Sequence, residues 1–302
     1  ALELHFADIS AMAAQLNNNS FIIKHFGATS RNSKMAIPQG VEKIDLAKVK
    51  NDNNGQLWFL KYMVHLQTQL AYAALSKNQV KIDKIQGWFY RFERLLKAIF
   101  ESDSMALKYD ENQYNFILCD GDKSFDFNTL SDGFSAVLDI ITSMMMSMEV
   151  EVKNADETQT LPLYDLHGIV LIDEIDTHLH ISLQKSIFRI LTDFFPNIQF
   201  IVTTHSPFII NSVENAVVYD LEQSEVLEHM EIYSYETIAE VHFGATEYNT
   251  IITDKISHYS RLLNKQNKEA EDERAVAELK AYFDKVKDDL PKSIALKIWE
   301  IE

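Results

Sequence analysis

The sequence predicts an α/β fold in which helices flank a parallel sheet. Two apolar runs, 167–172 and 199–203, have the length and composition of strands that are buried on both faces. Between them, the segment from about Leu179 to Phe195 has the length and the pattern of a helix. A strand, a helix and a second strand in this order place the two strands in parallel within one sheet. We expect the run 216–221 to add a third strand.

The segments before this unit predict a helical insertion and a small antiparallel element. Apolar residues recur near a 3.6-residue period across 56–100, where a second helix covers about 86–101. The segment 105–128 alternates around the turn 120–122, which is typical of a β-hairpin. Earlier in the chain, the short apolar run 21–23 predicts a strand that ends in a polar turn.

The composition changes after residue 233. Lys, Glu, Asp and Ala dominate the stretch 246–289, which has few Gly or Pro and carries two apolar stripes at helical spacing. We therefore expect a head domain over 1–233, with the helical insertion at about 56–101, and a C-terminal helical tail over 234–302.

Size and charge limit the classes of protein to consider. With 302 residues and 46% apolar composition, the chain can bury a sizeable core in one or two domains. The formal net charge of −17 does not indicate a nucleic-acid partner, because phosphate binding needs clustered Lys and Arg. A local basic patch remains possible in one stretch, although a solvated helix face is the simpler interpretation of it. The stretch contains Lys81, Lys84, Arg91, Arg94 and Lys97.

The chain also has the character of a cytoplasmic protein. Its one cysteine, Cys119, excludes an intramolecular disulfide and lies in an apolar run, so we expect a small buried residue in a reducing compartment. No run approaches the roughly 18 apolar residues that a membrane span needs, and no signal peptide opens the sequence. We therefore expect no association with a membrane.

Two acids follow the first buried strand and are the strongest candidates for chemistry. Asp173 and Glu174 end the run 168–172, at the carboxyl edge where ligands bind in α/β sheets. Asp173 would hold Mg²⁺, directly or through water, and Glu174 would orient and deprotonate an attacking water. The alternative is a strand that ends in a solvated turn.

Two further groups are expected near a phosphate. His205 ends the second strand, and the intervening helix returns the chain so that His205 lies beside Glu174 and can sense a γ-phosphate. Ser131 and Gly133 begin an apolar helix, and helix N-termini favour phosphate oxygens. A lone histidine at a strand end is more often structural, and a capped helix often has no ligand. Because these residues occur together with the two acids, we favour a functional role for His205, Ser131 and Gly133.

These motifs together resemble the ABC/SMC ATPase superfamily. Residues 130–133, Leu-Ser-Asp-Gly, are similar to its Leu-Ser-Gly-Gly signature. Residues 170–174 match its Walker B motif, 175–180 its D-loop, and His205 its switch histidine. The resemblance implies a P-loop-type parallel sheet flanked by helices, with ATP and Mg²⁺ as cofactors. It also implies that Asp176 of the D-loop belongs to the nucleotide-binding residues.

The resemblance further implies how two copies would cooperate. The heads would pair head-to-tail as a homodimer or a higher oligomer, so that Ser131 and Gly133 of one head contact the γ-phosphate held by the other. Asp173 would bind the metal, while Glu174 and His205 would be the catalytic residues. Hydrolysis would loosen the pair and change the state of a bound effector.

A narrower resemblance concerns bacterial defence. Residues 173–180 and 203–209 look like the branch that holds the OLD-like ATPases, and 25–31 is similar to a strand-and-arginine segment of these proteins. The helical tail is similar to that of ATPases in Septu-type and retron-associated anti-phage systems, where the ATPase accompanies an HNH nuclease. The partner it implies is therefore a nuclease or toxin effector.

Three other functions remain open at this point. The chain is compatible with a DNA-repair ATPase head of the RecF or SMC type, although it contains no long coiled coil. It is also compatible with a non-hydrolysing scaffold that holds a nuclease or toxin. A nuclease with a TOPRIM domain would need acidic residues on strands after His205, and the tail offers them in a helical context, at Asp284, Asp288 and Asp289.

One expected motif is missing. None of the eight glycines is followed by Lys, so the Gly-x-x-x-x-Gly-Lys-Ser/Thr phosphate cradle does not occur. Either the sequence lacks a preceding segment that carries the cradle, or the ATPase is degenerate. We favour the first explanation, because Asp173, Glu174 and His205 serve hydrolysis alone.

Overall fold

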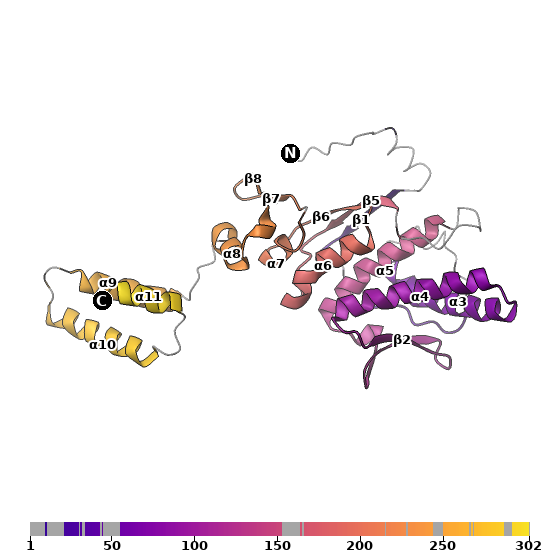
Figure 1. The fold of residues 1–302 in the computed structure, drawn as a ribbon, viewed down its shortest axis with the longest axis horizontal. Helices are drawn as coiled ribbons and strands as arrows, with labels where there is room; N and C mark the ends of the chain where they lie inside the picture. Colours follow the sequence, from indigo (N-terminus) through magenta and orange to yellow (C-terminus); the bar gives the residue numbers. More distant parts are fainter. Residues whose placement is uncertain are drawn as a thin grey trace. The chain divides into compact units, whose positions relative to one another are not determined.

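A parallel sheet lies at the centre of the computed structural model. Its strands β1 (Phe21–Phe26), β5 (His167–Ile172) and β6 (Ile198–Val202) stand in the order β1-β5-β6 (Figure 1). The structure describes residues 10, 21–29, 31, 34–42, 44, 55–152, 164, 166–214, 216–227, 229–243, 250–265, 267, 269–286 and 292–301.

Helix α6 (Ile181–Phe194) is the crossover between β5 and β6. Its apolar side faces the core through Leu183, Ile187, Ile190 and Leu191, while the opposite side is polar. Because the two strands run in parallel and a helix joins them, their carboxyl ends meet at one edge of the sheet. The predicted α/β fold class, a parallel sheet flanked by helices, is confirmed.

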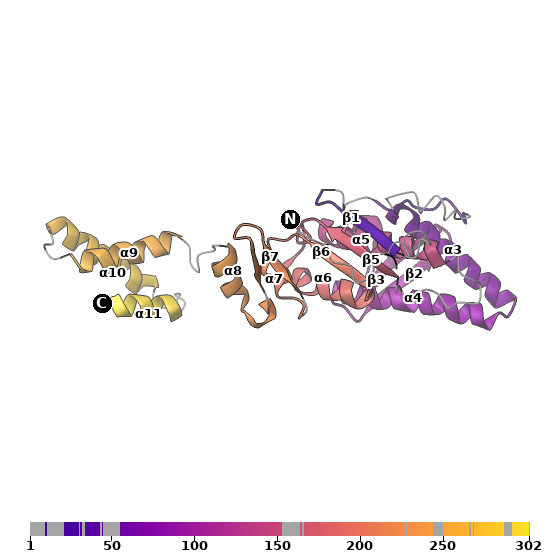
Figure 2. The ribbon, with the colours of Figure 1, turned by 90° about the horizontal axis from the view of Figure 1, so that it is seen from above.

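The predicted helical insertion is a hairpin of two long helices, α3 (Gln56–Leu75) and α4 (Gln79–Phe100). Asn78 accepts a hydrogen bond from the backbone N–H of Lys81 and so caps the second helix. The views of Figures 1 and 2 agree that the hairpin extends beyond the sheet. Its core is aromatic and is centred on Trp88, whose ring lies 5.1–6.0 Å from those of Phe59, Tyr62, Phe89 and Phe92.

A small antiparallel sheet follows, where a hairpin was predicted. Strands β3 (Asn115–Asp120) and β4 (Lys123–Asp126) form that hairpin, and β2 (Met105–Asp110) adds a third strand beside β3. Side chains alternate between the two faces, so Leu118 is fully buried while Cys119 points to the other face. Cys119 is half-buried, and the expectation of a buried cysteine was wrong for this reason.

Helix α5 (Asp132–Val152) carries the predicted signature at its start, after a short 3-10 turn, η1 (Phe127–Thr129). The middle of α5 is buried on almost every side, as its apolar composition predicts. It contacts α3 and strand β1, which places it between the helical hairpin and the parallel sheet.

The run 216–221 does not join the parallel sheet, and this expectation was wrong. Strand β7 (Val218–Asp220) pairs antiparallel with β8 (Glu225–Leu227) in a separate sheet. The Asp220 carboxylate accepts hydrogen bonds from the backbone N–H groups of Glu222 and Gln223, which closes a tight turn. The chain therefore folds back at once, and the third strand of the parallel sheet is β1. The remaining elements here are α7 (Pro207–Ile210), η2 (Met230–Ile232) and α8 (Tyr235–Phe243).

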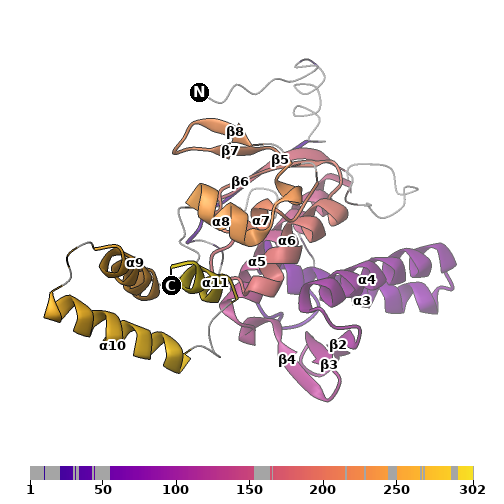
Figure 3. The same ribbon diagram turned by 60° about the vertical axis from the view of Figure 1, so that its left-hand side comes forward.

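The chain divides into two compact units, 1–235 and 236–302. The second unit contains all of α8 but its first residue, together with α9 (Thr250–Leu263), α10 (Ala270–Val286) and α11 (Lys292–Ile301), and α9 contacts both α10 and α11 (Figure 3). Its small core consists of Tyr259, Phe283, Ile294 and Ile298. None of the helices in the described ranges is long and apolar enough to cross a membrane.

Candidate functional site

The carboxyl edge of β5 and β6 brings the predicted groups together. Ile172 pairs with Val202, so Asp173 and Thr203 are the next residues on their two strands. The backbone ladder continues through both, from Asp173 N to Phe26 O at 2.8 Å and from Thr203 N to Ile172 O at 3.0 Å. Asp173, Glu174 and His205 therefore follow adjacent strand ends, and all three are exposed. This is the arrangement that the sequence predicts.

Thr203 connects the two strand ends and was not singled out from the sequence. Its hydroxyl donates a hydrogen bond to Asp173 Oδ1 at 2.6 Å, and its oxygen accepts one from the backbone N–H of Glu174 at 2.8 Å. Thr203 thereby fixes the Asp173 carboxylate and the start of the turn. The sequence signal that could have identified Thr203 is the position of a hydroxyl residue directly after the second buried strand.

The backbone of Glu174 adopts a left-handed conformation, with φ of +47°. Residues other than glycine rarely adopt it, because Cβ then crowds the following carbonyl, at a cost of about 1 kcal/mol. Arg31 supports this turn from beneath, since its Nη2 donates to the carbonyl oxygens of Asp173 and Glu174, both at 2.7 Å. Such strain persists only where the surroundings impose it, and it is common at functional sites.

Arg31 is itself almost fully buried, at 3% exposure. Burial lowers the pKa of its guanidinium, and the carboxylates of Asp173, Asp176, Glu174 and Asp139 oppose that shift. The sequence pointed to the segment 25–31 but not to this contact, which joins residues 142 positions apart.

Asp139 lies on α5 and is buried at 5% exposure. Burial raises the pKa of its carboxyl to about 7, and the nearby Arg31 charge counteracts part of the rise. Helix α5 and the turn after β5 are thus linked electrostatically through Arg31.

Asp176 makes contacts within its own head. Its Oδ1 accepts hydrogen bonds from the Thr204 hydroxyl and, at 3.3 Å, from the backbone N–H of His205. The carboxylate therefore holds the turn that carries His205. Glu174 Oε2 accepts from the Thr177 hydroxyl at 3.1 Å. The predicted role of Asp176 in nucleotide binding stays a prediction.

The predicted signature residues, Ser131 and Gly133, lie beside the segment 175–180. Ser131 is exposed, whereas Gly133 is buried, and a Cβ atom at Gly133 would lie 2.5 Å from the carbonyl oxygen of His178. No side chain fits in that space, so a glycine is required for the close approach. The structure thus brings the predicted signature and the predicted D-loop of one chain into contact.

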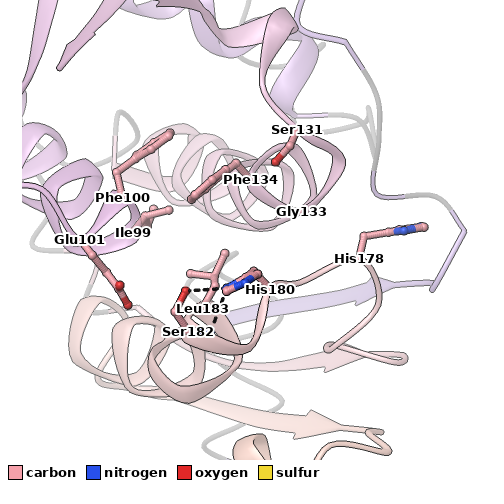
Figure 4. A pocket seen from close by; sticks show the side chains of 10 residues that line it. All are labelled: Ile99, Phe100, Glu101, Ser131, Gly133, Phe134, His178, His180, Ser182 and Leu183. Carbon is pink, nitrogen blue, oxygen red and sulfur yellow. Dashed lines mark hydrogen bonds between the residues drawn. The ribbon is translucent and has the colours of Figure 1, made fainter. Parts of the chain in front are cut away.

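A small pocket of about 130 Å³ opens between these two segments and the end of α4. His180 accepts a hydrogen bond from the backbone N–H of Ser182 and caps α6. Figure 4 shows His180 turned toward Ser182, whereas His178 points away from it. The polar residues that line the pocket are Glu101, Ser131, His178, His180 and Ser182.

The donor set at the sheet edge suits a hard cation. Asp173 and Thr203 offer oxygen atoms, and within the described ranges no group of three or more His, Cys, Asp or Glu side chains is arranged to hold a metal by itself. Mg²⁺ is commonly bound by one or two carboxylates together with substrate phosphates, so these residues fit it.

The fold and this edge define an α/β protein with a candidate phosphate site at the end of its parallel sheet. Residues 31–211 match the family model described as "AAA domain, putative AbiEii toxin, Type IV TA system". The chain belongs to this AAA family. The family description does not name the ABC/SMC superfamily, and that placement stays a prediction.

Individual relatives show which members of the family this chain resembles. The Septu protein PtuA of Bacillus thuringiensis is 26% identical over 168 residues, which cover 52% of this chain and 42% of that protein. The Retron Ec83 probable ATPase of Escherichia coli is 34% identical over 119 residues, 39% of this chain and 21% of its own length. The Retron Vc95 probable ATPase of Vibrio cholerae serotype O1 biovar El Tor is 57% identical over 47 residues, 16% and 9% of the two chains.

The likeness to Septu and retron ATPases is therefore confirmed. The chain spans less than half of the length of each of these relatives. The roles of Ser131, Gly133, Asp173, Asp176, Glu174 and His205 stay predictions.

Proposed function

We propose that this chain is the catalytic part of an ATPase head that binds ATP with Mg²⁺ at the carboxyl edge of β5 and β6. The observation that supports it most is the exposed set Asp173, Glu174 and His205 on adjacent strand ends, with Glu174 in a strained conformation. A structural turn alone would not require a strained residue that Arg31 must support from the protein interior.

Each residue has a defined task in this proposal. Glu174 acts as the general base for the attacking water, and Thr177 orients its carboxylate. Asp173, oriented by Thr203, holds the metal together with the phosphates. Bound Mg²⁺ neutralises phosphate charge. His205, whose turn is held by Asp176, contacts the γ-phosphate.

The nucleotide lies between two heads in this proposal. Ser131 is exposed at the start of α5, where backbone N–H groups favour phosphate oxygens. Gly133 rests on the carbonyl of His178, so a movement of the signature is passed directly to the segment after Glu174. Two copies arranged head-to-tail would bring Ser131 and Gly133 of one to the phosphate held by the other.

The biological setting we propose is anti-phage defence, with a nuclease or toxin effector as partner. The Septu and retron names of the relatives support the setting, and the net charge of −17 suits a basic partner. A DNA-repair head and a non-hydrolysing scaffold are the alternatives. The phosphate cradle, which the sequence of this chain lacks, must be supplied for hydrolysis to occur.

Glu174→Gln in the full-length protein tests the catalytic part. Removal of the base should lower the rate of ATP hydrolysis by about 10²–10³-fold while ATP still binds and the dimer accumulates, as seen by light scattering. Glu222→Gln, in the exposed turn between β7 and β8, makes the same charge change and should leave the rate unaltered. Equal hydrolysis by Glu174→Gln and wild type would exclude Glu174 as the base.

Mixing two inactive variants tests the head-to-tail arrangement. Ser131→Arg should block the signature and Glu174→Gln should block the base, so each variant alone is inactive. If sites are composite, a mixed pair contains one intact site, and an equimolar mixture should regain about a quarter of the wild-type rate. A mixture that stays inactive, although the variants pair, would contradict the composite site.

A further inference from the structure

One side of α4 carries cations that no element of the ATPase site uses. Lys84, Gly87, Tyr90, Arg91 and Arg94 recur every three or four residues and so share one side of the helix, the α4 basic face. The opposite side of α4 packs into the core through Ile85, Trp88, Phe92, Leu95, Leu96 and Ile99. Lys84 and Arg94 are separated by ten residues, about 15 Å along the helix axis.

The charge of this region is opposite to that of the chain. Residues 56–101 contain seven basic residues and three acidic ones, so their net charge is +4, in a chain whose formal net charge is −17. Cations that served only solubility would be interspersed with acids over the whole surface. Their concentration on one hairpin creates a local positive potential, which favours an anionic partner there.

The two arginines of the face differ in how open they are to an outside partner. Arg94 is exposed, and within the part of the chain that the structure describes it forms no ion pair. Arg91 is half-buried: its Nε and Nη2 are covered by protein and have no hydrogen-bond partner, which leaves Nη1 as the nitrogen that could reach a phosphate. Lys97 differs, because Glu93 lies 3.5 Å from it. A guanidinium presents a planar fork of donors that matches two phosphate oxygens.

Gly87 lies between these cations and has no internal reason to be a glycine. A glycine weakens a helix interior, yet a Cβ atom at Gly87 would meet nothing within 4 Å. The missing side chain therefore leaves room for something outside the protein to approach the helix backbone. Tyr90 lies one turn further on and is 65% exposed, so its ring is open to a planar partner.

We propose that the α4 basic face binds single-stranded nucleic acid. Lys84, Arg91 and Arg94 contact consecutive phosphates, the backbone passes over Gly87, and Tyr90 stacks on a base. An acidic protein would also satisfy the cations, but it offers no flat base for Tyr90 and no narrow phosphodiester backbone for the space above Gly87. The proposal does not depend on ATP binding or hydrolysis.

The test measures binding of a fluorescent 30-nucleotide oligo(dT) to the full-length protein by anisotropy. With three phosphate contacts, Kd should rise about 20-fold between 50 and 200 mM salt. Arg91→Gln combined with Arg94→Gln should weaken binding about tenfold or more and reduce the salt dependence. Arg274→Gln combined with Lys285→Gln, two exposed positions on α10, removes the same charge and should have little effect.

Gly87→Glu keeps the test decisive if loss of Arg91 disturbs folding. It fills open space and removes a helix-weakening glycine, so the protein should stay folded while the added charge repels phosphate. Gly87→Ala is the matched control: its methyl group narrows the space above the helix without adding charge, so it should weaken oligo(dT) binding much less than Gly87→Glu does. The proposal is overturned if oligo(dT) does not bind at 50 mM salt, if the α4 and α10 variants behave alike, or if polyglutamate competes as well as unlabelled oligo(dT).

Discussion

Glu174 and Glu149 show two opposite environments for a carboxylate in one head. Glu174 is exposed on a left-handed turn and accepts a side-chain hydrogen bond from Thr177. Glu149, near the end of α5, is buried at 3% exposure. Its oxygens accept hydrogen bonds from Tyr62 at 2.6 Å, Trp88 at 2.9 Å and Tyr164 at 3.1 Å.

The difference separates the proposed general base, Glu174, from a structural carboxylate, Glu149. Burial raises the pKa of both Tyr62 and Tyr164 well above the ordinary value, and the Glu149 charge adds to the rise, so both hydroxyls keep their protons and donate. Glu149 therefore joins α3, α4, α5 and the chain before β5 into one hydrogen-bonded centre. A base that must take a proton from water needs the opposite, an exposed carboxylate with free lone pairs.

Removal of the buried carboxylate should have the largest effect on stability. Glu149→Ala leaves three buried donors without an acceptor and should lower the free energy of unfolding by about 4 kcal/mol. Glu149→Gln keeps one acceptor oxygen and should cost less. Urea-induced unfolding of the full-length protein measures both. Glu174→Ala, on the exposed turn, is the control and should change stability by less than about 0.5 kcal/mol; equal losses at the two positions would refute the distinction.

Mutation at the contact between the start of α5 and the segment 175–180 should lower stability nearly as much. Gly133→Ala places a Cβ atom 2.5 Å from the His178 carbonyl, and because that neighbour is backbone, it cannot turn aside. We expect a loss of about 2–3 kcal/mol in thermal or urea unfolding. Gly87→Ala is the matched helical control and should stabilise the protein by about 0.5–1 kcal/mol. A tolerated Gly133→Ala would show that the contact is not tight in solution.

Asp139 should give a smaller effect that depends on pH. Its pKa is about 7 in the folded protein, against about 4 when unfolded. Between these values the folded form keeps a proton that the unfolded form has lost, so stability falls as pH rises and the loss is complete above about pH 7. Asp139→Asn removes this dependence, although it also removes the charge next to Arg31.

Thermal unfolding at several pH values checks this expectation. The stability of Asp139→Asn relative to wild type should rise by about 2–3 kcal/mol between pH 5 and pH 8. Asp193→Asn, at an exposed position of α6, controls for the change in net charge. A difference between Asp139→Asn and wild type that is constant with pH would show that Asp139 titrates normally.

Much of the candidate site follows from local patterns. Buried strands are continuous apolar runs, and an acid or histidine directly after such a run must lie at the carboxyl edge of a parallel sheet. Asp173, Glu174 and His205 were placed correctly for this reason, without any knowledge of long-range contacts. The helical hairpin and the tail were predictable because their apolar residues follow the helix period.

The sequence by itself therefore determined which elements form and which polar residues end the strands. Only the tertiary structure decided that β1, rather than the run 216–221, completes the sheet, and that Arg31 supports the Glu174 turn from 143 positions away in the sequence. It also decided that the buried Glu149 carboxylate accepts hydrogen bonds from three side chains, whereas burial raises the pKa of the Asp139 carboxyl. The physical reason is that periodicity reflects the burial of each element, whereas strain, desolvation and hydrogen bonding depend on groups that the fold brings together from distant positions.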